Sequence, residues 1–444
     1  MDIELKARNF AIKAHSGQVR KSDPEKPMIV HPINVGQILK QYEFDGNVVA
    51  AGYLHDVVED TSYELIDIKN NFGEDIASLV CGANEPDKSL SWEERKKHTI
   101  EETKKIDFRH KAVICADKIS NLEDLRILSE IKGEYDFSAF KRGFEAQKWY
   151  YTEVYNSLIF NENENHPMVV RLKELIEHIF NDKNDNDYVK NVIFKDNIEE
   201  YKLLNKIHYR KEEVFKLKKV LSNQIPYVIE FTGTPRTGKT SLINNLEDFF
   251  KKKGFAVEVL KEFTTTKKYK KEIYPTLKHK YKDLVYTEIP KHVLKELEES
   301  INKNPDIIII DRSLFDRLIW VERLVLKDVV SNDEYTEYKK FYMPLIKEKI
   351  DIIISMYTDS LTALKREYNA SLSLEKRTFL NKENVDEYNK ALINIEKLSK
   401  QEEINFKLFD TTSKNQREIS FEIIDFILTD MKNNLLQKLK KEFN

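Results

Sequence analysis

The segment Ala50–Thr61, AAGYLHDVVEDT, places a His-Asp pair and a Glu-Asp pair on either side of two valines. Residues four apart share one face of a helix, so His55 and Asp56 are expected beside Glu59 and Asp60. The surrounding residues are apolar and leave little solvent-facing surface for these groups. A buried carboxylate needs a metal or a charged partner, because desolvating an unpaired charge is too costly. The pattern therefore favours a metal site over a solvated acidic surface.

Two other residues of the N-terminal half complete a possible set of metal ligands. His31 precedes a proline in IVHPINVG, and Asp117 follows an apolar run in KAVICADKISNLEDL. Together with His55 and Asp56, they would supply two imidazoles and two carboxylates from three separate helices. This mixture of nitrogen and oxygen donors suits Mn²⁺, Fe²⁺ or Zn²⁺ better than Ca²⁺.

A metal at such a site suggests hydrolytic chemistry. A divalent ion with open positions lowers the pKa of a bound water and produces a hydroxide nucleophile near neutral pH. Glu59 and Asp60 would then orient this water or carry its proton.

A phosphate-binding motif lies in the C-terminal half. The apolar run YVIEFT leads directly into GTPRTGKTS, which matches the pattern G-x-x-x-x-G-K-[ST]. The backbone N–H groups of such a loop and the helix that follows it cradle phosphates. Its lysine reaches the β- and γ-phosphates, and its threonine binds Mg²⁺. We therefore expect ATP and Mg²⁺ at Gly233, Thr234, Pro235, Arg236, Thr237, Gly238, Lys239, Thr240 and Ser241, with Thr240 as the magnesium ligand.

Further charged residues of this half are expected near the phosphates. Glu262 ends the second β-rich run, and Asp311 and Arg312 end the third, so all three point to the carboxyl edge of a sheet. The basic segment LTALKREYNASLSLEKRTFL carries Arg366 and Arg377. These two arginines could close over a transferring phosphoryl group and neutralise its charge, although an ordinary basic surface is an equal alternative.

The elements that must position these residues fall into three zones. Residues 1–158 carry apolar residues at helical spacing, which predicts an all-α domain. Residues 159–223 are first Asn-rich and then helical in period, which indicates a helical connector. Residues 224–444 alternate β-rich runs with helices, which predicts a five-stranded parallel sheet covered on both faces. The expected strands are residues 227–233, 256–261, 306–311, 351–357 and 404–410.

Composition agrees with several domains in a reducing compartment. The chain has 444 residues, of which 41% are hydrophobic, enough for more than one core. Its net charge of −3 means that a nucleic acid would have to bind a local basic patch. Two cysteines exclude a disulfide framework, and no window reaches about 18 uncharged apolar residues. We expect a cytoplasmic protein that does not associate with membranes.

Five segments of the N-terminal half resemble, in the same order, the HD-type hydrolases that remove the 3′-pyrophosphate of guanosine alarmones. These hydrolases include the hydrolase domain of RelA/SpoT enzymes and the small stand-alone alarmone hydrolases. The resemblance covers about residues 1–155. The segments are AHSGQVRK (14–21), VHP (30–32), AAGYLHDVVEDT (50–61), FGEDIASLV (72–80) and ADKISNL (116–122).

The resemblance implies an all-α HD fold with Mn²⁺ bound by the two histidines and two aspartates named above. It also implies Glu59 and Asp60 as the pair that activates water. Arg20 and Lys21 would lie near the nucleotide, and Asn121 near its ribose or phosphate. The chain departs from the family at Met28, where a tyrosine is usual, and in the segment CGANEPDKS (81–89).

The C-terminal half resembles P-loop kinases, in particular deoxynucleoside and thymidylate kinases, over residues 225–412. The P-loop and the segment DRS are the specific motifs. The resemblance implies Glu262 as general base, Asp311 at the magnesium and Arg312 at the acceptor or phosphate. Arg366 and Arg377 would belong to a lid.

Three functions fit these features. The first is a bifunctional enzyme, in which a Mn²⁺-dependent phosphohydrolase of a (p)ppGpp-like 3′-phosphorylated nucleotide is joined to an ATP-dependent kinase of nucleosides or nucleotides. The second is a nucleic-acid end-healing enzyme with 2′,3′-phosphoesterase and 5′-hydroxyl kinase activities, a domain order found in bacteria. The third is an HD hydrolase regulated by a nucleotide-sensing P-loop domain. The alarmone motifs are the closer match and favour the first, while the oligomeric state stays open.

Overall fold

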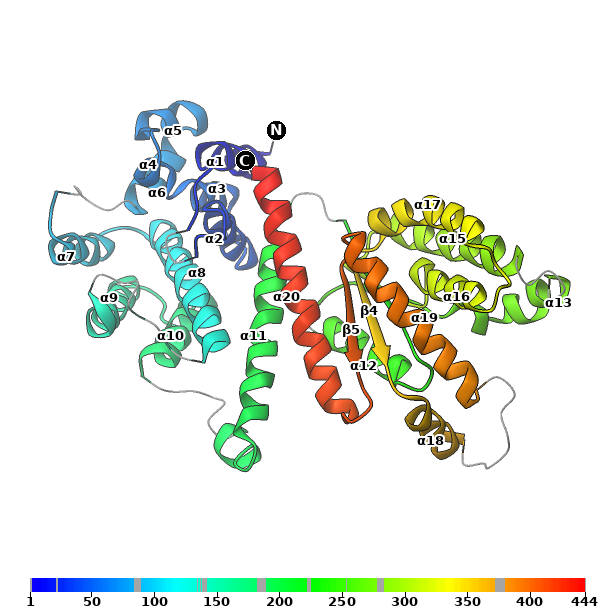
Figure 1. The fold of residues 1–444 in the computed structure, drawn as a ribbon. Helices are drawn as coiled ribbons and strands as arrows, with labels where there is room; N and C mark the ends of the chain where they lie inside the picture. Colours follow the sequence, from blue (N-terminus) through cyan, green and yellow to red (C-terminus); the bar gives the residue numbers. More distant parts are fainter. Residues whose placement is uncertain are drawn as a thin grey trace. The chain divides into compact units, whose positions relative to one another are not determined.

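The computed structural model describes residues 2–20, 23–83, 89–133, 135, 137, 142–181, 189–221, 225–252, 254–277, 283–371 and 380–443 (Figure 1). The chain divides into two compact units. Unit 1 comprises Met1–Ser222 and Lys432–Asn444, and unit 2 comprises Asn223–Met431. A helical part followed by an α/β part with a five-stranded parallel sheet confirms the predicted fold class. The separate connector remains a prediction, and its described helices belong to unit 1.

The regular elements of unit 1 in the described residues are all helices, and one isolated β-bridge joins Val19 and Pro27. Its elements are α1 (Ile3–Ala14), α2 (Val30–Gln41), α3 (Gly46–Leu54), α4 (Val57–Asp60), α5 (Leu65–Phe72), α6 (Glu74–Ala83), α7 (Trp92–Thr103), α8 (Phe108–Lys132), α9 (Gly143–Leu158), α10 (Pro167–Phe180), the π-helix η1 (Val189–Ile193) and α11 (Ile198–Val220).

Helices α3 and α8, which lead to His55 and carry Asp117, each begin with a side-chain cap. The Asp45 carboxylate accepts the backbone N–H groups of Asn47 and Val48 at the start of α3. At the start of α8, the Asp107 carboxylate accepts the N–H of His110. A cap of this kind stabilises a helix by about 1 kcal/mol, since it satisfies an N–H group that the helix leaves unpaired.

Helices α2 and α3 pack very closely because glycines face the contact. A Cβ atom at Gly36 of α2 would clash with the ring of Tyr53 of α3, and a Cβ atom at Gly52 would clash with Leu39. This close approach brings the start of α2 toward the end of α3. The histidines His31 and His55 lie at those two positions.

The segment AAGYLHDVVEDT does not form the continuous helix that its apolar spacing predicts. Helix α3 ends at Leu54, and the short helix α4 starts at Val57. His55 and Asp56 lie between the two helices, with helical backbone angles. At the break, the Nδ1 atom of His55 bonds the carbonyl oxygen of Gly52 in α3, and its Nε2 atom meets His31 of α2, a tertiary contact that the apolar spacing does not reveal.

Unit 2 consists of a parallel sheet and its covering helices. The strands are β1 (Tyr227–Gly233), β2 (Val257–Leu260), β3 (Ile307–Asp311), β4 (Ile352–Tyr357) and β5 (Phe406–Asp410). The helical elements are α12 (Lys239–Lys251), η2 (Phe263–Thr265), η3 (Tyr269–Ile273), α13 (Tyr274–Leu277), η4 (Leu284–Glu288), α15 (Ile289–Asn302), α16 (Leu314–Leu326), α17 (Asn332–Lys349), α18 (Ser360–Ser371), α19 (Lys382–Gln401) and α20 (Gln416–Phe443).

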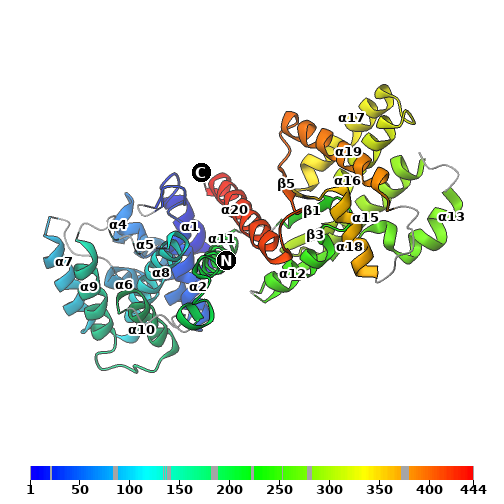
Figure 2. The same cartoon turned by 60° about the horizontal axis from the view of Figure 1, so that its bottom comes forward.

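The strand order in this sheet is β2-β3-β1-β4-β5, and all neighbours are parallel. Strand β1, which leads into the P-loop, is therefore central, with β3 and β4 beside it. Figure 2 labels β1 and β3 side by side in this sheet. Alternate side chains of each strand point to opposite faces, and both faces of β1 are buried. Val228 of β1 and Ile308 and Ile310 of β3 face a core formed with α15, α16, α17 and α19.

The last helix, α20, is shared between the units. Its residues up to Met431 count with unit 2, and those from Lys432 count with unit 1. Within unit 2 it packs on the sheet edge, where the rings of Phe409 and Phe426 have centroids 5.7 Å apart. Among the helices that the structure describes, none has the length and apolar character needed to cross a membrane.

Candidate active sites

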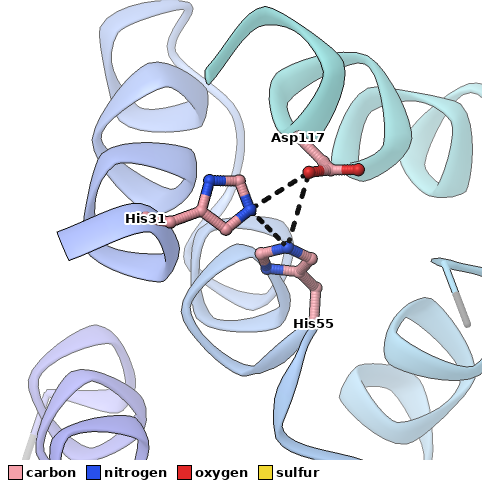
Figure 3. A group of neighbouring side chains, drawn as sticks. All are labelled: His31, His55 and Asp117. Carbon is pink, nitrogen blue, oxygen red and sulfur yellow. Dashed lines mark hydrogen bonds and ion pairs between the residues drawn. The ribbon is translucent and has the colours of Figure 1, made fainter. Parts of the chain in front are cut away.

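Two histidines and two aspartates of unit 1 converge on one point, as their spacing in the sequence predicts. His31 comes from α2, His55 follows α3, and Asp117 comes from α8, with their polar atoms turned toward one another (Figure 3). His31 Nε2 lies 3.1 Å from Asp117 Oδ1, and the two Nε2 atoms are 3.2 Å apart. The Asp56 carboxylate lies 3.2 Å from His55 Nε2 and 3.5 Å from His31 Nε2.

In both imidazoles the Nδ1 atom makes a hydrogen bond away from the cluster, which leaves Nε2 facing the proposed metal position. His55 Nδ1 lies 2.9 Å from the carbonyl oxygen of Gly52, which can only accept a hydrogen bond. His31 Nδ1 lies 3.0 Å from the hydroxyl of Ser120. If both Nδ1 atoms carry the proton, the Nε2 lone pairs face each other and require a cation between them. The donor set therefore fits a divalent metal.

The charges of the clustered side chains shift one another's pKa values and keep the aspartates ionised, as a cation site requires. Burial and the charge of Arg20 lower the pKa of His31 to about 4. At His55 burial opposes protonation, but the charge of Asp56 outweighs it and raises the pKa to about 9. Burial would raise the pKa of Asp117, yet Lys118 and His31 hold it well below its usual range. The aspartates are therefore ionised at neutral pH.

Asp117 is oriented by two neighbours on α8. Asn121 Nδ2 donates to Asp117 Oδ1 at 2.6 Å, and Lys118 Nζ donates to Oδ2 at 2.6 Å. Arg20 in turn donates from Nη2 to Asn121 Oδ1 at 2.9 Å. Arg20 and Asn121, which were predicted to contact the substrate, thus lie next to the metal ligands and to each other.

A cavity of about 330 Å³ opens beside this cluster and is lined by Arg20, Lys118 and Asn121. Its wall also contains residues that the sequence analysis did not single out, from α7 and α9. The Trp92 and Tyr150 rings have centroids 6.1 Å apart, and Lys96 Nζ lies 4.5 Å from the Tyr150 centroid. The remaining lining side chains include Lys132, Gln147 and Tyr151. The cavity thus combines aromatic rings with several cations, which suits a base and phosphates.

Four other predicted residues and one segment have a less direct place in the structure. Glu59 and Asp60 lie in α4, immediately after the cluster, and both are half-buried. Met28 is buried, and its sulfur lies 4.0 Å from Arg20 Nη1, so this departure from the family lies next to a residue of the cavity. Lys21 lies outside the described residues, as does most of the segment 81–89.

The P-loop of unit 2 adopts a phosphate-binding shape between β1 and α12. Gly233 has φ +129° and no room for a Cβ atom against Met356, which explains why glycine stands there. Gly238, at φ +89°, precedes the first residue of α12. Lys239 Nζ lies 2.7 Å from Asp311 Oδ1, and the Thr240 hydroxyl lies 3.3 Å from Asp311 Oδ2.

The other residues of the loop serve mainly to shape it. The Thr234 N–H donates to the carbonyl oxygen of Met356 at 2.8 Å, and its hydroxyl donates to Asn389. The Thr237 hydroxyl donates to the carbonyl oxygen of Thr234 at 3.1 Å. Arg236 has φ +63° and pairs with Glu367 of α18. Pro235 is half-buried, and Ser241 is exposed.

Arg312 occupies a buried position between the ends of three strands. Its Nη2 atom donates to the carbonyl oxygen of Gly233 at 2.9 Å, and Nη1 pairs with Asp316 Oδ1 at 2.8 Å. Glu262, just after β2, lies 3.5 Å from Arg312 Nε and is partly exposed. Glu262, Asp311 and Arg312 therefore lie near the P-loop, as predicted from their places after the strands.

The buried Glu230 of β1 supports this arrangement, although it stands inside the apolar run YVIEFT and belongs to no motif. Its carboxylate accepts the N–H groups of Ser313, Phe315 and Asp316 at 2.7, 3.1 and 2.8 Å. These groups form the first turn of α16, which carries Asp316. Burial raises the pKa of Glu230 to about 7, although the three hydrogen bonds oppose the shift.

We expect Glu230→Gln to remove part of the pH dependence of unfolding of unit 2. The folded pKa of about 7 exceeds the ordinary value of 4.5. The stabilisation by this proton is therefore complete below pH 4.5 and is lost as the pH rises through 7. Urea unfolding, followed by Trp320 fluorescence in a background with Trp92 and Trp149 replaced by Phe, gives the free energy of unfolding of each protein. The free energy of the wild type minus that of the Glu230→Gln variant should fall across this window, and a flat difference would contradict the assignment.

Of the two predicted lid arginines, the structure describes only Arg366. Its guanidinium donates to the carbonyl oxygen of Thr411 at 2.7 Å, and Nη1 lies 3.5 Å from the carbonyl oxygen of Arg236 in the P-loop. Arg366 thus reaches the P-loop from α18. Arg377 lies outside the described residues.

Comparisons with known proteins match both halves of the chain. A family described as HD domain matches residues 7–135, and a family described as AAA domain matches residues 228–346. The guanosine-3′,5′-bis(diphosphate) 3′-pyrophosphohydrolase MESH1 of Drosophila melanogaster is 39% identical over 125 residues, which is 28% of this chain and 69% of that protein. MESH1 of Xenopus tropicalis is 41% identical over 125 residues, with the same coverage of both chains.

Solved structures are similar to parts of the chain. The structure of a metazoan orthologue of SpoT that hydrolyses ppGpp has 30% identity, covers 40% of this chain and 96% of its own, and gives a TM-score of 0.35. The structure of deoxyadenosine kinase from M. mycoides with bound dATP has 22% identity, covers 46% of this chain and 99% of its own, and gives a TM-score of 0.32.

Proposed function

Because the chain belongs to the family of HD-domain guanosine-3′,5′-bis(diphosphate) 3′-pyrophosphohydrolases, we propose that unit 1 hydrolyses the 3′-phosphate ester of a (p)ppGpp-like nucleotide. The observation that carries the proposal is the convergence of two imidazoles and two carboxylates beside a cavity lined by cations and aromatic rings. Mn²⁺ bound by His31, His55, Asp56 and Asp117 would lower the pKa of a coordinated water and so supply the nucleophile.

In this proposal the residues around the metal site bind the substrate, orient a ligand or accept a proton. Arg20 and Lys118 neutralise phosphate charge in the cavity, while Trp92 and Tyr150 stack on the base. Asn121 holds Asp117 in its ligand orientation through the 2.6 Å hydrogen bond. Glu59 and Asp60 take the proton of the attacking water, since they lie in α4, the short helix that starts just after Asp56.

A panel of substrates tests the hydrolase proposal. We expect the full chain with Mn²⁺ to release pyrophosphate from guanosine-3′,5′-bis(diphosphate), and EDTA to abolish this release. Mn²⁺ should also raise the melting temperature of the wild-type chain but not that of an Asp117→Ala variant, which provides a readout that does not depend on turnover. Release from a 3′-phosphorylated oligonucleotide alone would refute the alarmone-type substrate and favour the end-healing function.

Unit 2 acts, in the same proposal, as an ATP-dependent kinase of a nucleoside or nucleotide. The P-loop, with Lys239, Thr240 and Asp311 in contact, supports binding of the ATP phosphates and Mg²⁺. Glu262 serves as general base, while Arg312 and Arg366 neutralise the transferring phosphoryl group. Transfer of labelled phosphate from ATP to an acceptor tests this half. No transfer, together with ATP-dependent changes in hydrolysis, would instead identify unit 2 as a nucleotide sensor.

A further inference from the structure

Unit 2 contains a cavity of about 350 Å³ beside the P-loop that the P-loop chemistry leaves unused. Pro235 of the P-loop and Arg312 form one part of its wall. Trp320 and Arg323 of α16, together with Lys327 just after its last residue, are spaced three and four residues apart and form another. The cavity therefore extends from the P-loop along α16.

The lining of this cavity carries an excess of positive charge. Arg312, Arg323 and Lys327 line it, and the described lining residues include no carboxylate. Arg323 and Lys327 share a single oxygen, Glu387 Oε2, at 3.3 and 2.8 Å. One carboxylate thus faces two cations, which leaves a net charge for a ligand to neutralise.

Arg323 also has hydrogen-bonding capacity that its neighbours do not use. The residue is 9% exposed, and among the described residues its Nε atom has no hydrogen-bond partner. Leaving a buried guanidinium N–H unpaired is costly, so such a group points to a missing acceptor. Phosphate and carboxylate oxygens are the acceptors that guanidinium groups bind best.

Two aromatic rings add apolar surface to the same cavity. The centroids of Trp320 and Tyr388 are 6.1 Å apart, with their planes at 69°. The guanidinium carbon of Arg323 lies 4.5 Å from the Trp320 centroid, and that of Arg312 lies 5.6 Å from the Tyr388 centroid. These contacts hold the arginines in place and offer a surface to a planar ring.

The cations lie at two different distances from the P-loop. Arg312 bonds Gly233 of the loop and Asp316 in the first turn of α16. Arg323 lies seven residues after Asp316, which is about 10 Å along a helix that rises 1.5 Å per residue. An anion bound by Arg323 and Lys327 would therefore lie well away from the phosphoryl group that is transferred.

We propose that this cavity binds the phosphate acceptor, and that the acceptor is a nucleoside bearing a free hydroxyl for the P-loop and a phosphate at its opposite end. A 5′-hydroxyl with a 3′-phosphate has this arrangement, either in a mononucleotide or at the 5′ end of a strand. The inference rests on the kinase function proposed above. The acceptor oxygen bonds the γ-phosphorus, the bond to the β–γ bridging oxygen breaks, ADP leaves, and the hydroxyl proton passes to Glu262.

Equilibrium binding separates this acceptor class from neutral nucleosides. The full chain is titrated with a nucleoside, its 3′-monophosphate and its 5′-monophosphate in the presence of ADP and Mg²⁺. We expect the 3′-monophosphate to bind at least ten-fold more tightly than the other two. Arg323→Gln should lose this ten-fold preference and keep the nucleoside affinity, whereas the exposed control Arg417→Gln should behave as the wild type.

A second variant, Lys327→Gln, tests whether an effect of Arg323→Gln comes from lost packing and not from lost charge. Lys327 is 41% exposed, so its replacement should leave the buried contacts intact. This variant should lose several-fold in 3′-monophosphate affinity. Equal or tighter binding of the nucleoside or the 5′-monophosphate, or no binding of any of the three, would overturn the inference. So would variants that weaken nucleoside and 3′-monophosphate equally.

Transfer of labelled phosphate distinguishes the two sources of the acceptor and tests the kinase itself. A higher kcat/KM with a 5′-hydroxyl oligonucleotide than with the 3′-mononucleotide assigns the strand end, and the reverse assigns the mononucleotide. Selective binding without transfer to any acceptor refutes the kinase function and retains the anion site. Transfer to nucleosides without a preference for the 3′-monophosphate retains the kinase and refutes the inference.

Discussion

Replacing Asp56 with asparagine is expected to slow Mn²⁺-dependent pyrophosphate release by about a thousand-fold, or roughly 4 kcal/mol of transition-state stabilisation. The Asp56 carboxylate lies 3.2 Å from His55 Nε2 and 3.5 Å from His31 Nε2, within the predicted coordination sphere. The substitution removes a negative charge that a divalent cation requires and leaves a weaker amide oxygen. Initial rates over a range of Mn²⁺ concentrations measure the loss.

The matched control for this variant is Asp248→Asn, an exposed aspartate of α12 in an i,i+4 pair with Lys252. It should keep the wild-type rate and Mn²⁺ dependence. The far-ultraviolet circular dichroism of Asp56→Asn should match that of the wild type, and its phosphate transfer from ATP should be retained. An unchanged Mn²⁺ dependence would contradict the ligand assignment, and loss of both activities in a folded protein would contradict separate sites.

Lys239→Met is expected to lower ATP-dependent phosphate transfer by about a thousand-fold while hydrolysis continues at the wild-type rate. Lys239 is buried at the mouth of the P-loop and pairs with Asp311 at 2.7 Å. Burial lowers its pKa, yet its ammonium is the group expected to meet the β- and γ-phosphates. Methionine keeps the length of the side chain and removes the charge.

Lys251→Ala is the control for this second variant, because Lys251 lies on the same helix, is 52% exposed and pairs only with Glu247 among the ion pairs described. Both kinase and hydrolase rates should be unchanged in this control. ATP binding by calorimetry separates a loss of affinity from a loss of rate. Wild-type transfer by a folded Lys239→Met protein would show that the P-loop is not the catalytic nucleotide site.

The residues proposed to bind the metal could be named from the sequence because their types and order are specific. His31, the pair His55–Asp56 and Asp117 each stand in a short motif, and the helices that carry them converge. Their hydrogen-bond partners were not predictable in the same way. Ser120 and the carbonyl oxygen of Gly52 determine which nitrogen of each ring faces the cluster, and this depends on ring orientation in the packed protein.

The residues that line the cavity of unit 1 are even harder to predict from the sequence. Trp92 and Lys96 come from α7, while Tyr150 comes from α9, and none of these stands in a motif. In the sequence each looks like an ordinary core or surface residue of an amphipathic helix. Only the packing of α7 on α9, and of α9 on α8, brings them to one wall next to Arg20.

The amino-acid sequence by itself determined the P-loop, the strand-and-helix alternation around it and the ligand types of the metal site. These features depend on contiguous residues, since a phosphate loop is made by the backbone of about eight successive positions. The tertiary structure decided the break of the helix at His55, the buried support of α16 by Glu230 and the cationic wall around Arg323. Each of these depends on a contact between residues that are distant in the chain, and long-range packing determines which of them meet.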